Sequence, residues 1–316
     1  PPALYSFKHS FMLNIERLIP EPQVGLGEGL LLGVKRALGE DLERTFRQTG
    51  IIHIVVLSGY NVMIVVTFIL FILGAIFGRR LSSVFGIIGI ILFALLVGLG
   101  ATVVRASLMA SLLLVMGFTG RIYLAIRGLF LAGALMVIWN PYSLVFDIGF
   151  QLSFLATLGL ILFSPYLSKQ LSIVPNLIGM REFVVATLAT QLFVLPLLLY
   201  QMGEFSVVAV IVNVMVLPMV AVAMLLTFLT GIISFLSSSL ALPFAYVAHL
   251  SLSYIIIIAE WFGALSFAAF SVPPFSVWFV PLGYAAIAGL LWQLNREPNT
   301  LKGWQIVEEV ESKNTL

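Results

Sequence analysis

Nine long apolar runs, separated by short segments rich in glycine, proline or charged residues, dominate the chain. A helix of about 20 apolar residues, rising ~1.5 Å per residue, spans the ~30 Å hydrocarbon core of a bilayer. The pattern therefore predicts an all-α fold, a polytopic transmembrane helical bundle of about nine spans. The prolines, glycine and charged residues of Leu162–Arg181 predict a loop. The predicted spans are roughly Ile51–Phe77, Leu81–Leu99, Thr102–Phe118, Ile122–Trp139, Leu144–Phe163, Phe183–Tyr200, Ser206–Phe235, Leu240–Trp261 and Phe275–Leu294.

The first 50 residues follow a different pattern, in which apolar residues recur at helical spacing among polar ones. Such a stripe predicts an amphipathic helix on the membrane surface, followed here by further short helices. The chain is thus expected to have a helical lead-in at 1–50, a transmembrane domain at 51–296 and a tail at 297–316. The stripe consists of Phe7, Phe11, Ile15 and Leu18.

Composition agrees with a membrane protein and excludes several other classes. The chain is 61% hydrophobic and only 9% charged, with a mean hydropathy of +1.12, whereas soluble domains carry about 25% charged residues. The net charge of +2 is too small for a basic nucleic-acid clamp. Because cysteine is absent, disulfides, thiolate catalysis and cysteine-based metal sites are excluded.

Lysine and arginine predict the orientation in the membrane. They occupy alternate loops, and the positive-inside rule then places residues 1–50 outside and the C-terminus in the cytoplasm. Basic residues within 1–50 oppose this assignment, although acidic residues are interleaved with them. The basic residues in the alternate loops are Arg79, Arg80, Arg121, Lys169, Arg181, Arg296 and Lys302.

Four chemically unusual residues interrupt the first apolar run: His53, Ser58, Gly59 and Asn61. On a helix, His53 and Asn61 lie about 80° apart, so both could face one cavity. The cluster indicates either a broken helix that lines or braces a polar path, or a close helix contact with satisfied polar groups. A hydrolytic Ser58–His53 pair is disfavoured, because the two are about 140° apart on a helix and the G-x-S-x-G context is missing.

A second set of polar residues lies in two later spans. Arg105 is one turn inside its predicted span, where it must snorkel, pair or face water. Asp147 is a natural ionic partner, and an Arg105–Asp147 pair and an anion-attracting site are both open interpretations. Asp147 and Gln151 share one helix face. Their alternative role is structural, as hydrogen-bonded contacts between helices next to capping by Asn140 or Ser143.

Three further residues complete the candidate set for a polar path. Asn213 is a polar residue within a span, and Pro196 and Pro218 are expected to break their helices and free backbone carbonyls. The sequence has no nucleotide-binding loop of the form G-x-x-x-x-G-K-[ST] and no H-E-x-x-H motif. We therefore expect no ATPase or hydrolase activity, no cofactor and no metal.

Four ordered segments resemble the ComEC-type competence family. FRQTGIIHIVVLSGYNVMIV is similar to its H-x-x-x-x-S-G signature, which His53, Ser58, Gly59 and Asn61 fill. TVVRASLMA resembles the R-A segment at Arg105. NPYSLVFDIGFQLSFLATLGL resembles the stretch with Asn140, Asp147, Gln151 and Ser153, and LPLLLYQMGEFSVVAVIVNVMVLP resembles the segment with Pro196, Asn213 and Pro218.

The resemblance implies a channel that passes single-stranded DNA across the bacterial inner membrane during natural transformation. It also implies an extracytoplasmic DNA receptor, a cytoplasmic helicase-like ATPase and contact with membrane lipid. The path would run through one subunit or along the interface of a homo-oligomer. Full-length members add an OB-like and a metallo-β-lactamase-like domain, which these 316 residues do not resemble.

Two other classes of function fit the composition. A transporter of small solutes or lipid-linked substrates would also place polar residues at mid-membrane. A non-conducting membrane scaffold would instead use them to hold helices together.

Overall fold

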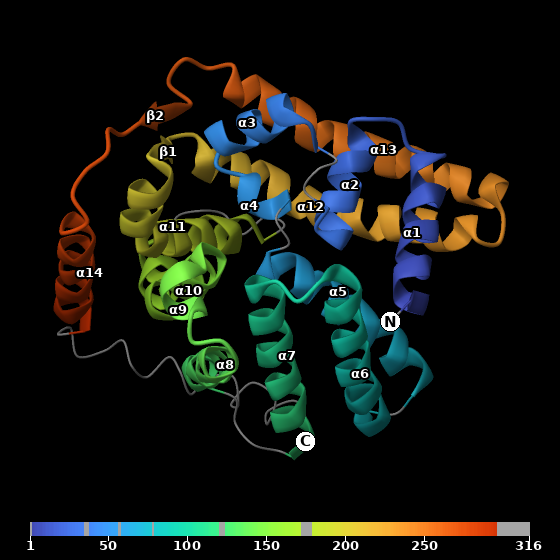
Figure 1. The fold of residues 1–316 in the computed structure, drawn as a ribbon, viewed down its shortest axis with the longest axis horizontal. Coiled ribbons are helices and arrows are strands. Elements are labelled where there is room, and N and C mark those ends of the chain that lie inside the picture. Colours follow the sequence, from blue (N-terminus) through green and yellow to red (C-terminus); the bar gives the residue numbers. More distant parts are fainter. Residues whose placement is uncertain are drawn as a thin grey trace. The chain divides into compact units, whose positions relative to one another are not determined.

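The computed structural model describes residues 2–34, 38–55, 58–77, 79–119, 124–171 and 179–295. Its elements, labelled in Figure 1, are overwhelmingly helical, as the apolar runs predict. They are α1 (Pro2–Glu16), α2 (Gln23–Leu32), α3 (Glu40–Gln48), α4 (Ile52–Val55), α5 (Gly59–Ile76), α6 (Arg79–Val97), α7 (Ala101–Thr119), α8 (Ala125–Trp139), α9 (Ser143–Phe146), α10 (Ile148–Gln170), α11 (Met180–Met202), β1 (Glu204–Ser206), α12 (Ala209–Ser234), α13 (Ser238–Gly263), β2 (Ala269–Ser271) and α14 (Phe279–Asn295).

The nine predicted spans each correspond to an apolar helix within the described ranges. α10, α11, α12 and α13 are long and apolar enough to cross a membrane, while α5, α6, α7, α8 and α14 are shorter apolar helices. Helices satisfy every backbone hydrogen bond within one segment, which is what a chain surrounded by hydrocarbon requires. The all-α, helical membrane fold is therefore confirmed.

Some boundaries differ from the sequence prediction. The run from Ile51 to Phe77 is two helices, α4 and α5, rather than one. The segment 162–171, predicted as a loop, continues α10 to Gln170 with Pro165 inside the helix. The predicted tail at 297–316 lies outside the described residues.

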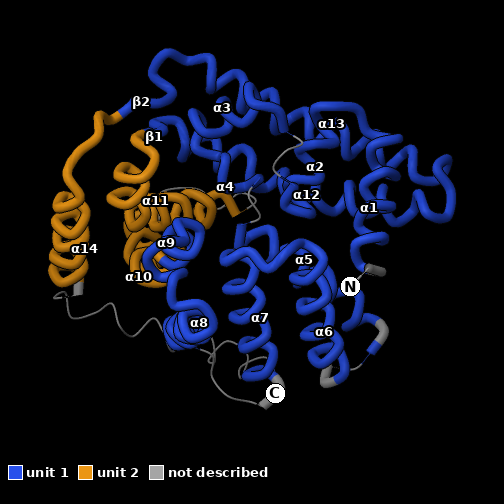
Figure 2. Tube along the Cα trace, in the orientation of Figure 1, with its two compact units in different colours: residues 1–154, 204–271 blue, residues 155–203, 272–316 orange. Residues whose placement is uncertain are grey.

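The chain divides into two units, shown in Figure 2. The first comprises residues 1–154 and 204–271, and the second comprises residues 155–203 and 272–316. In the second unit α11 packs on α14, and Phe163, Ala189, Phe193 and Ile287 form its buried core.

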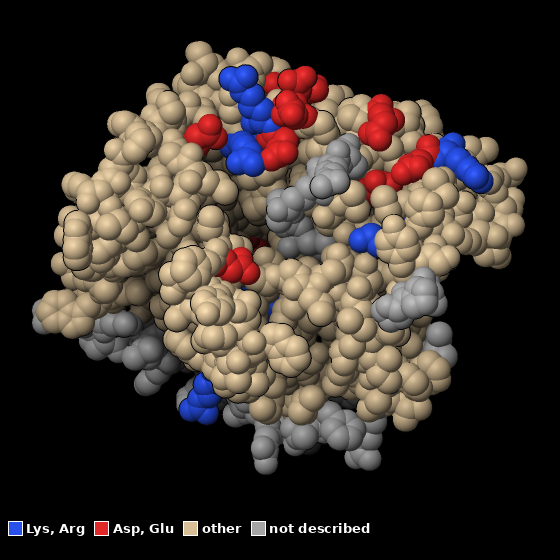
Figure 3. Space-filling model, in the orientation of Figure 1, with Lys and Arg blue, Asp and Glu red and all other residues tan. Residues whose placement is uncertain are grey.

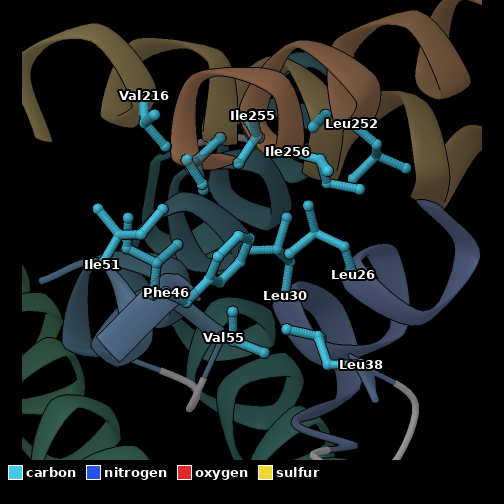
Figure 4. Packing of buried hydrophobic residues seen from close by; sticks show 14 of the residues in the cluster. Leu26, Leu30, Leu38, Phe46, Ile51, Val55, Val216, Leu252, Ile255 and Ile256 are labelled. Atoms are coloured by element: carbon cyan, nitrogen blue, oxygen red, sulfur yellow. The ribbon is translucent and has the colours of Figure 1, made fainter. Parts of the chain in front are cut away.

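The centre of the first unit is the helix pair α12 and α13, which pack along each other (Figure 1). α2 lies against both of them, and nine of its ten residues are buried. Figure 4 shows Leu26 and Leu30 of α2 meeting Leu252, Ile255 and Ile256 of α13. The same core takes in residues of α3 and α4, so the lead-in at 1–50 is built into the first unit.

The amphipathic stripe of α1 packs on protein. Phe11 and Ile15 are buried, and the Phe11 ring fits so closely against Gly231 of α12 that a side chain at this position would clash with it. Phe7, more exposed, stacks on Phe235 with ring centroids 5.7 Å apart. α1 is thus amphipathic as predicted, and its apolar stripe covers α12.

Charged side chains gather on one part of the face drawn in Figure 3, over α1, α3 and α13, and are sparse elsewhere on it. α3 alone carries Glu40, Asp41 and Glu43 in its first turn and Arg47 in its last, which suits the helix dipole. A charged cap above apolar helices is the distribution expected where one end of a bundle meets water and its sides meet lipid.

A small antiparallel ribbon is the one element type that the sequence analysis did not predict. β1 pairs with β2 in the register Glu204↔Ser271, Phe205↔Phe270 and Ser206↔Ala269. α11 ends just before it at Gly203, whose φ of +64° suits glycine and lets its N–H bond the Leu199 carbonyl.

Glu28 is a charged residue inside the core of the first unit that the sequence analysis overlooked. Its side chain is 3% exposed, and Oε1 has no hydrogen-bond partner among the described residues. Desolvation raises the pKa of Glu28 to about 7; Glu16, which also hydrogen-bonds to it, and Glu21 reinforce the shift, while Lys8 opposes it. The sequence did contain a signal for this buried residue, since Glu28 is the lone acidic residue in the apolar segment 23–32.

The stability of the first unit should therefore fall as the pH rises. Because the pKa of Glu28 exceeds its ordinary value of 4.5, the folded state binds more protons than the unfolded state between about pH 4.5 and 7. We expect Glu28→Gln to flatten the pH dependence of the thermal unfolding midpoint in detergent. The native chain should lose at most about 3.5 kcal/mol across this window, at ~1.4 kcal/mol per pKa unit. Glu260→Gln, at an exposed carboxyl group on α13, is the control and should keep the native slope. Equal slopes in the native chain and Glu28→Gln would contradict the assignment.

Candidate functional site

The interruption between α4 and α5 forms the centre of the candidate site. α4 ends at Val55 and α5 begins at Gly59, with Ser58 as the N-cap in an extended conformation. Ser58 Oγ accepts a hydrogen bond of 3.2 Å from the backbone N–H of Asn61. A serine here satisfies one of the donors that every helix start leaves unpaired. The broken helix anticipated from the sequence is present.

Asn61 holds the broken ends together. Its Nδ2 donates to the carbonyl oxygens of Ile54, at 2.8 Å, and Leu30, at 3.2 Å, and its Oδ1 accepts from Ser58 Oγ at 3.0 Å. The side chain is completely buried. Asn61 therefore braces the interruption by joining α2, α4 and α5, and it presents no surface to a path.

His53 lies apart from Asn61, contrary to the expectation that both face one cavity. Its Nδ1 is 2.9 Å from the Gly50 carbonyl oxygen, an arrangement in which Nδ1 carries the proton. The His53 side chain remains exposed. Ser58 is committed to Asn61 and His53 to Gly50, so their contacts give no support to a nucleophile and base.

Arg105, on α7, brings three elements of the first unit together. Its side chain is 7% exposed, and Nε donates to Ser153 Oγ on α10 at 2.5 Å. One Nη lies 3.7 Å from Met109 Sδ. The other lies so near Gly59 that a Cβ there would be 2.8 Å from it. Because Gly59 has no side chain, the guanidinium fits beside the first turn of α5. The start of α5 carries a partial positive charge from the helix dipole.

The Arg105–Asp147 ion pair is not formed, although the structure describes both residues. Asp147 instead caps α10, with Oδ1 accepting from the Phe150 N–H at 3.0 Å. A carboxylate just before a helix start meets unpaired N–H groups and a favourable dipole, and this local interaction prevails over a distant guanidinium. Of the two interpretations of Arg105, the structure favours a positive group beside the helix break.

Gln151 folds α9 back on α10. Its Nε2 donates to the carbonyl oxygens of Leu144 and Val145, both at 2.9 Å. Asn140 Oδ1 accepts from the Tyr142 N–H at 3.2 Å and shapes the preceding turn. Residues 140–151, which connect α8 to α10 through α9, are called the elbow below. Asp147 and Gln151 both stabilise the elbow, and the residue that caps α10 is Asp147 rather than Asn140 or Ser143.

The remaining candidates occupy helix interiors. Asn213 on α12 is buried, and its Oδ1 has no partner among the described residues. Pro196 and Pro218 do not break their helices, because α11 and α12 run through them. Tyrosine hydroxyls donate to carbonyls nearby, Tyr284 to Phe193 in the second unit and Tyr60 to Leu217 in the first. Neighbouring helices thus supply extra donors near the prolines.

No three His, Asp or Glu side chains among the described residues lie close enough together to hold a metal ion. The polar contacts described at the candidate site are hydrogen bonds and one buried guanidinium. Ser153, the partner of Arg105, is a residue whose role the sequence analysis missed, since no spacing rule links α7 to the second turn of α10.

Comparison with known proteins identifies the family. A sequence model of the family described as "Competence protein" matches residues 30–297. This chain belongs to the Competence protein family. It is 27% identical over 202 residues to ComE operon protein 3 of Bacillus subtilis (strain 168), covering 64% of this chain and 25% of that protein. It is 33% identical over 149 residues to an uncharacterized protein of Aquifex aeolicus (strain VF5), covering 46% of this chain and 35% of that protein.

The chain thus aligns with only a quarter to about a third of the length of these relatives. No solved structure matches it. The segment matched by the Competence protein family contains every contact of the helix break, from the Leu30 carbonyl to Ser153. With its apolar helices, family membership identifies the chain as a multi-pass membrane protein.

Asn61 should make a large contribution to stability. Asn61→Ala leaves the carbonyl groups of Leu30 and Ile54 without their side-chain donor, and each buried unsatisfied group costs about 1–3 kcal/mol. We expect a loss of about 2–5 kcal/mol in the free energy of unfolding, measured with purified protein in detergent. Asn14→Ala, at a half-exposed position on α1, should change it by less than about 1 kcal/mol. Similar values for the two variants would show that the buried bonds matter little.

Gly59 and Gly74 offer a matched pair of substitutions within α5. A Cβ at Gly59 meets the Arg105 guanidinium at 2.8 Å, whereas nothing lies within 4 Å of one at Gly74. Gly74→Ala should stabilise the helix by up to about 1 kcal/mol through lost backbone freedom. Gly59→Ala should instead destabilise it by about 1 kcal/mol, because the methyl group pushes Arg105 from Ser153. Thermal unfolding of both variants checks the opposite signs, and a shift of the same sign in both would refute the close contact.

Proposed function

We propose that this chain forms the path along which single-stranded DNA crosses the bacterial inner membrane during natural transformation. The observation that carries the proposal is the Arg105 guanidinium, buried among apolar helices beside a broken helix. A charge in such surroundings costs several kcal/mol and marks the handling of polar groups by membrane proteins. Membership of the Competence protein family supports a role in competence, and the resemblance of the four ordered sequence segments implies that this role is the uptake of DNA.

The electrostatics of the break suit weak binding of a polyanion. The start of α5 and the Arg105 side chain both favour negative charge at the same place. The other polar groups at the break are neutral. Asn61 and Ser58 form hydrogen bonds with each other and with the nearby backbone. A conduit needs sites weak enough to release the strand, and many fixed cations would hold it. One cation in an apolar bundle meets that requirement.

The proposal extends to partners and orientation. The sequence contains no nucleotide-binding loop, so a cytoplasmic helicase-like ATPase would supply the force, and an extracytoplasmic receptor would deliver the DNA. We place residues 1–50 outside and the C-terminus in the cytoplasm. We further propose that the chain has no enzymatic activity of its own and that copies of it assemble around or beside the strand.

Arg105 should be required for uptake. Arg105→Ala removes the buried charge, and we expect internalised fluorescent or radiolabelled DNA to fall at least tenfold in cells with a normal protein level. Arg105→Lys keeps the charge but not the planar fork that reaches Ser153 and Gly59, so it should restore uptake only in part. Arg127→Ala, at an exposed position on α8, is the control and should leave uptake unchanged.

The opposite outcomes separate the competing functions. Normal uptake in Arg105→Ala would refute the path assignment. Normal uptake combined with lost transport of a small anion in proteoliposomes would favour a solute transporter. Loss of partner recruitment alone, without any change in conductance, would favour a membrane scaffold.

A further inference from the structure

The elbow between α8 and α10 exposes two aromatic rings that the break does not use. Tyr142, just before α9, and Phe146, at its end, are 71% and 75% exposed. Their ring centroids lie 6.3 Å apart with 42° between the planes. Both belong to the first unit. Aromatic faces of this kind bind flat, apolar or π-bonded partners.

An open hollow of about 400 Å³ adjoins the two rings. Its wall includes Asn140, Ser143 and Asp147, and its size falls within the ~300–1,000 Å³ of small-molecule sites. Asn140 Oδ1 and Asp147 Oδ1 are engaged with backbone N–H groups. The Asn140 amide group, the Ser143 hydroxyl group and the second Asp147 oxygen remain for a ligand.

The elbow holds these groups in place without a ligand. Gln151 pins the Leu144 and Val145 carbonyls, and Asp147 fixes the start of α10. Behind the elbow, Phe150 and Phe154 stack with centroids 6.0 Å apart, and Phe154 meets Phe130 of α8 edge-on at 5.7 Å. A preorganised site loses less conformational freedom on binding than a flexible one.

We propose that Tyr142 and Phe146 form a stacking platform for a nucleobase of single-stranded DNA, whose edge meets Asn140, Ser143 and Asp147. This inference deepens the proposed function and rests on it. The Asp147 carboxylate disfavours phosphate, so the ligand at this position is a base rather than the backbone. Carboxylate and amide groups pair with the amino and ring nitrogen groups of bases.

Lipid is the competing occupant, and the polar wall argues against it. An acyl chain would cover the two rings but leave the amide, hydroxyl and carboxylate groups without partners, at a cost. An anionic lipid headgroup would be repelled by the Asp147 carboxylate. A base uses both features of the hollow, since every base has a face that stacks and an edge that forms hydrogen bonds.

The test measures binding of a short fluorescent oligonucleotide to the whole chain in nanodiscs. Two probes are compared, a mixed-sequence single strand and an abasic strand with the same number of phosphates. We expect the Tyr142→Ala/Phe146→Ala double variant to bind the base-bearing strand at least about tenfold more weakly, in line with the stacking energy per base. Its affinity for the abasic strand should not change. Leu144→Ala, at an exposed position of α9 outside the hollow, should match the native chain with both strands.

The outcomes distinguish failure of the platform from failure of the proposed function. Unchanged affinity in the double variant, or an equal loss with both strands, overturns the platform, while the Arg105 uptake test stands independently. Absence of any DNA binding by the native chain overturns the platform and counts against the DNA path. A tryptophan introduced by Tyr142→Trp reports which molecule covers the surface. If lipids brominated along the acyl chain quench its fluorescence, and adding the DNA strand does not relieve the quenching, the surface binds lipid and the platform is overturned.

Discussion

The first unit depends on how backbone carbonyls are satisfied where the helix breaks. Interrupting a helix inside an apolar bundle leaves N–H and C=O groups without intrahelical partners, and hydrocarbon offers none. Asn61 meets this constraint with one side chain, which binds the carbonyls of Leu30 and Ile54 and the hydroxyl group of Ser58. Ser58 in turn caps α5. The break between α4 and α5 is thus a built structure with its own hydrogen bonds, and α2 is tied to it.

The position of the break determines where the buried charge can lie. α5 begins with a glycine, and the missing side chain leaves the space that the Arg105 guanidinium occupies. Ser153 holds the same guanidinium from α10. One cation is therefore fixed by elements that are distant in sequence. Losing the space at Gly59 or the bond to Ser153 would move the charge relative to the helix start.

The sequence was sufficient for the features that arise within one segment. Apolar runs of about 20 residues predicted the apolar helices of the described segments, and the polar cluster at 53–61 indicated a break as one of two interpretations. Contacts between helices could not be predicted from the sequence, because nothing in the residue spacing links Arg105 to Ser153 or Asn61 to Leu30. The Arg105–Asp147 pair, one of two open interpretations of the sequence, is not formed, because the N–H groups at the start of α10 compete for the Asp147 carboxylate. Pro196 and Pro218 were expected to break their helices, whereas α11 and α12 run through them.

The two interruptions of the first unit share one chemical solution. At the break, Asn61 Nδ2 binds two carbonyl oxygens, and at the elbow, Gln151 Nε2 binds two as well. A primary amide is suited to this task because it offers two donors without a charge. A lysine would bring a charge whose burial costs far more than the carbonyls return, and a carboxylate could only accept. The unpaired backbone carbonyls at each interruption therefore explain why a carboxamide side chain stands there. Arg105 differs from both amides because it brings a charge to the first of these interruptions, where it bonds Ser153 and lies beside Gly59.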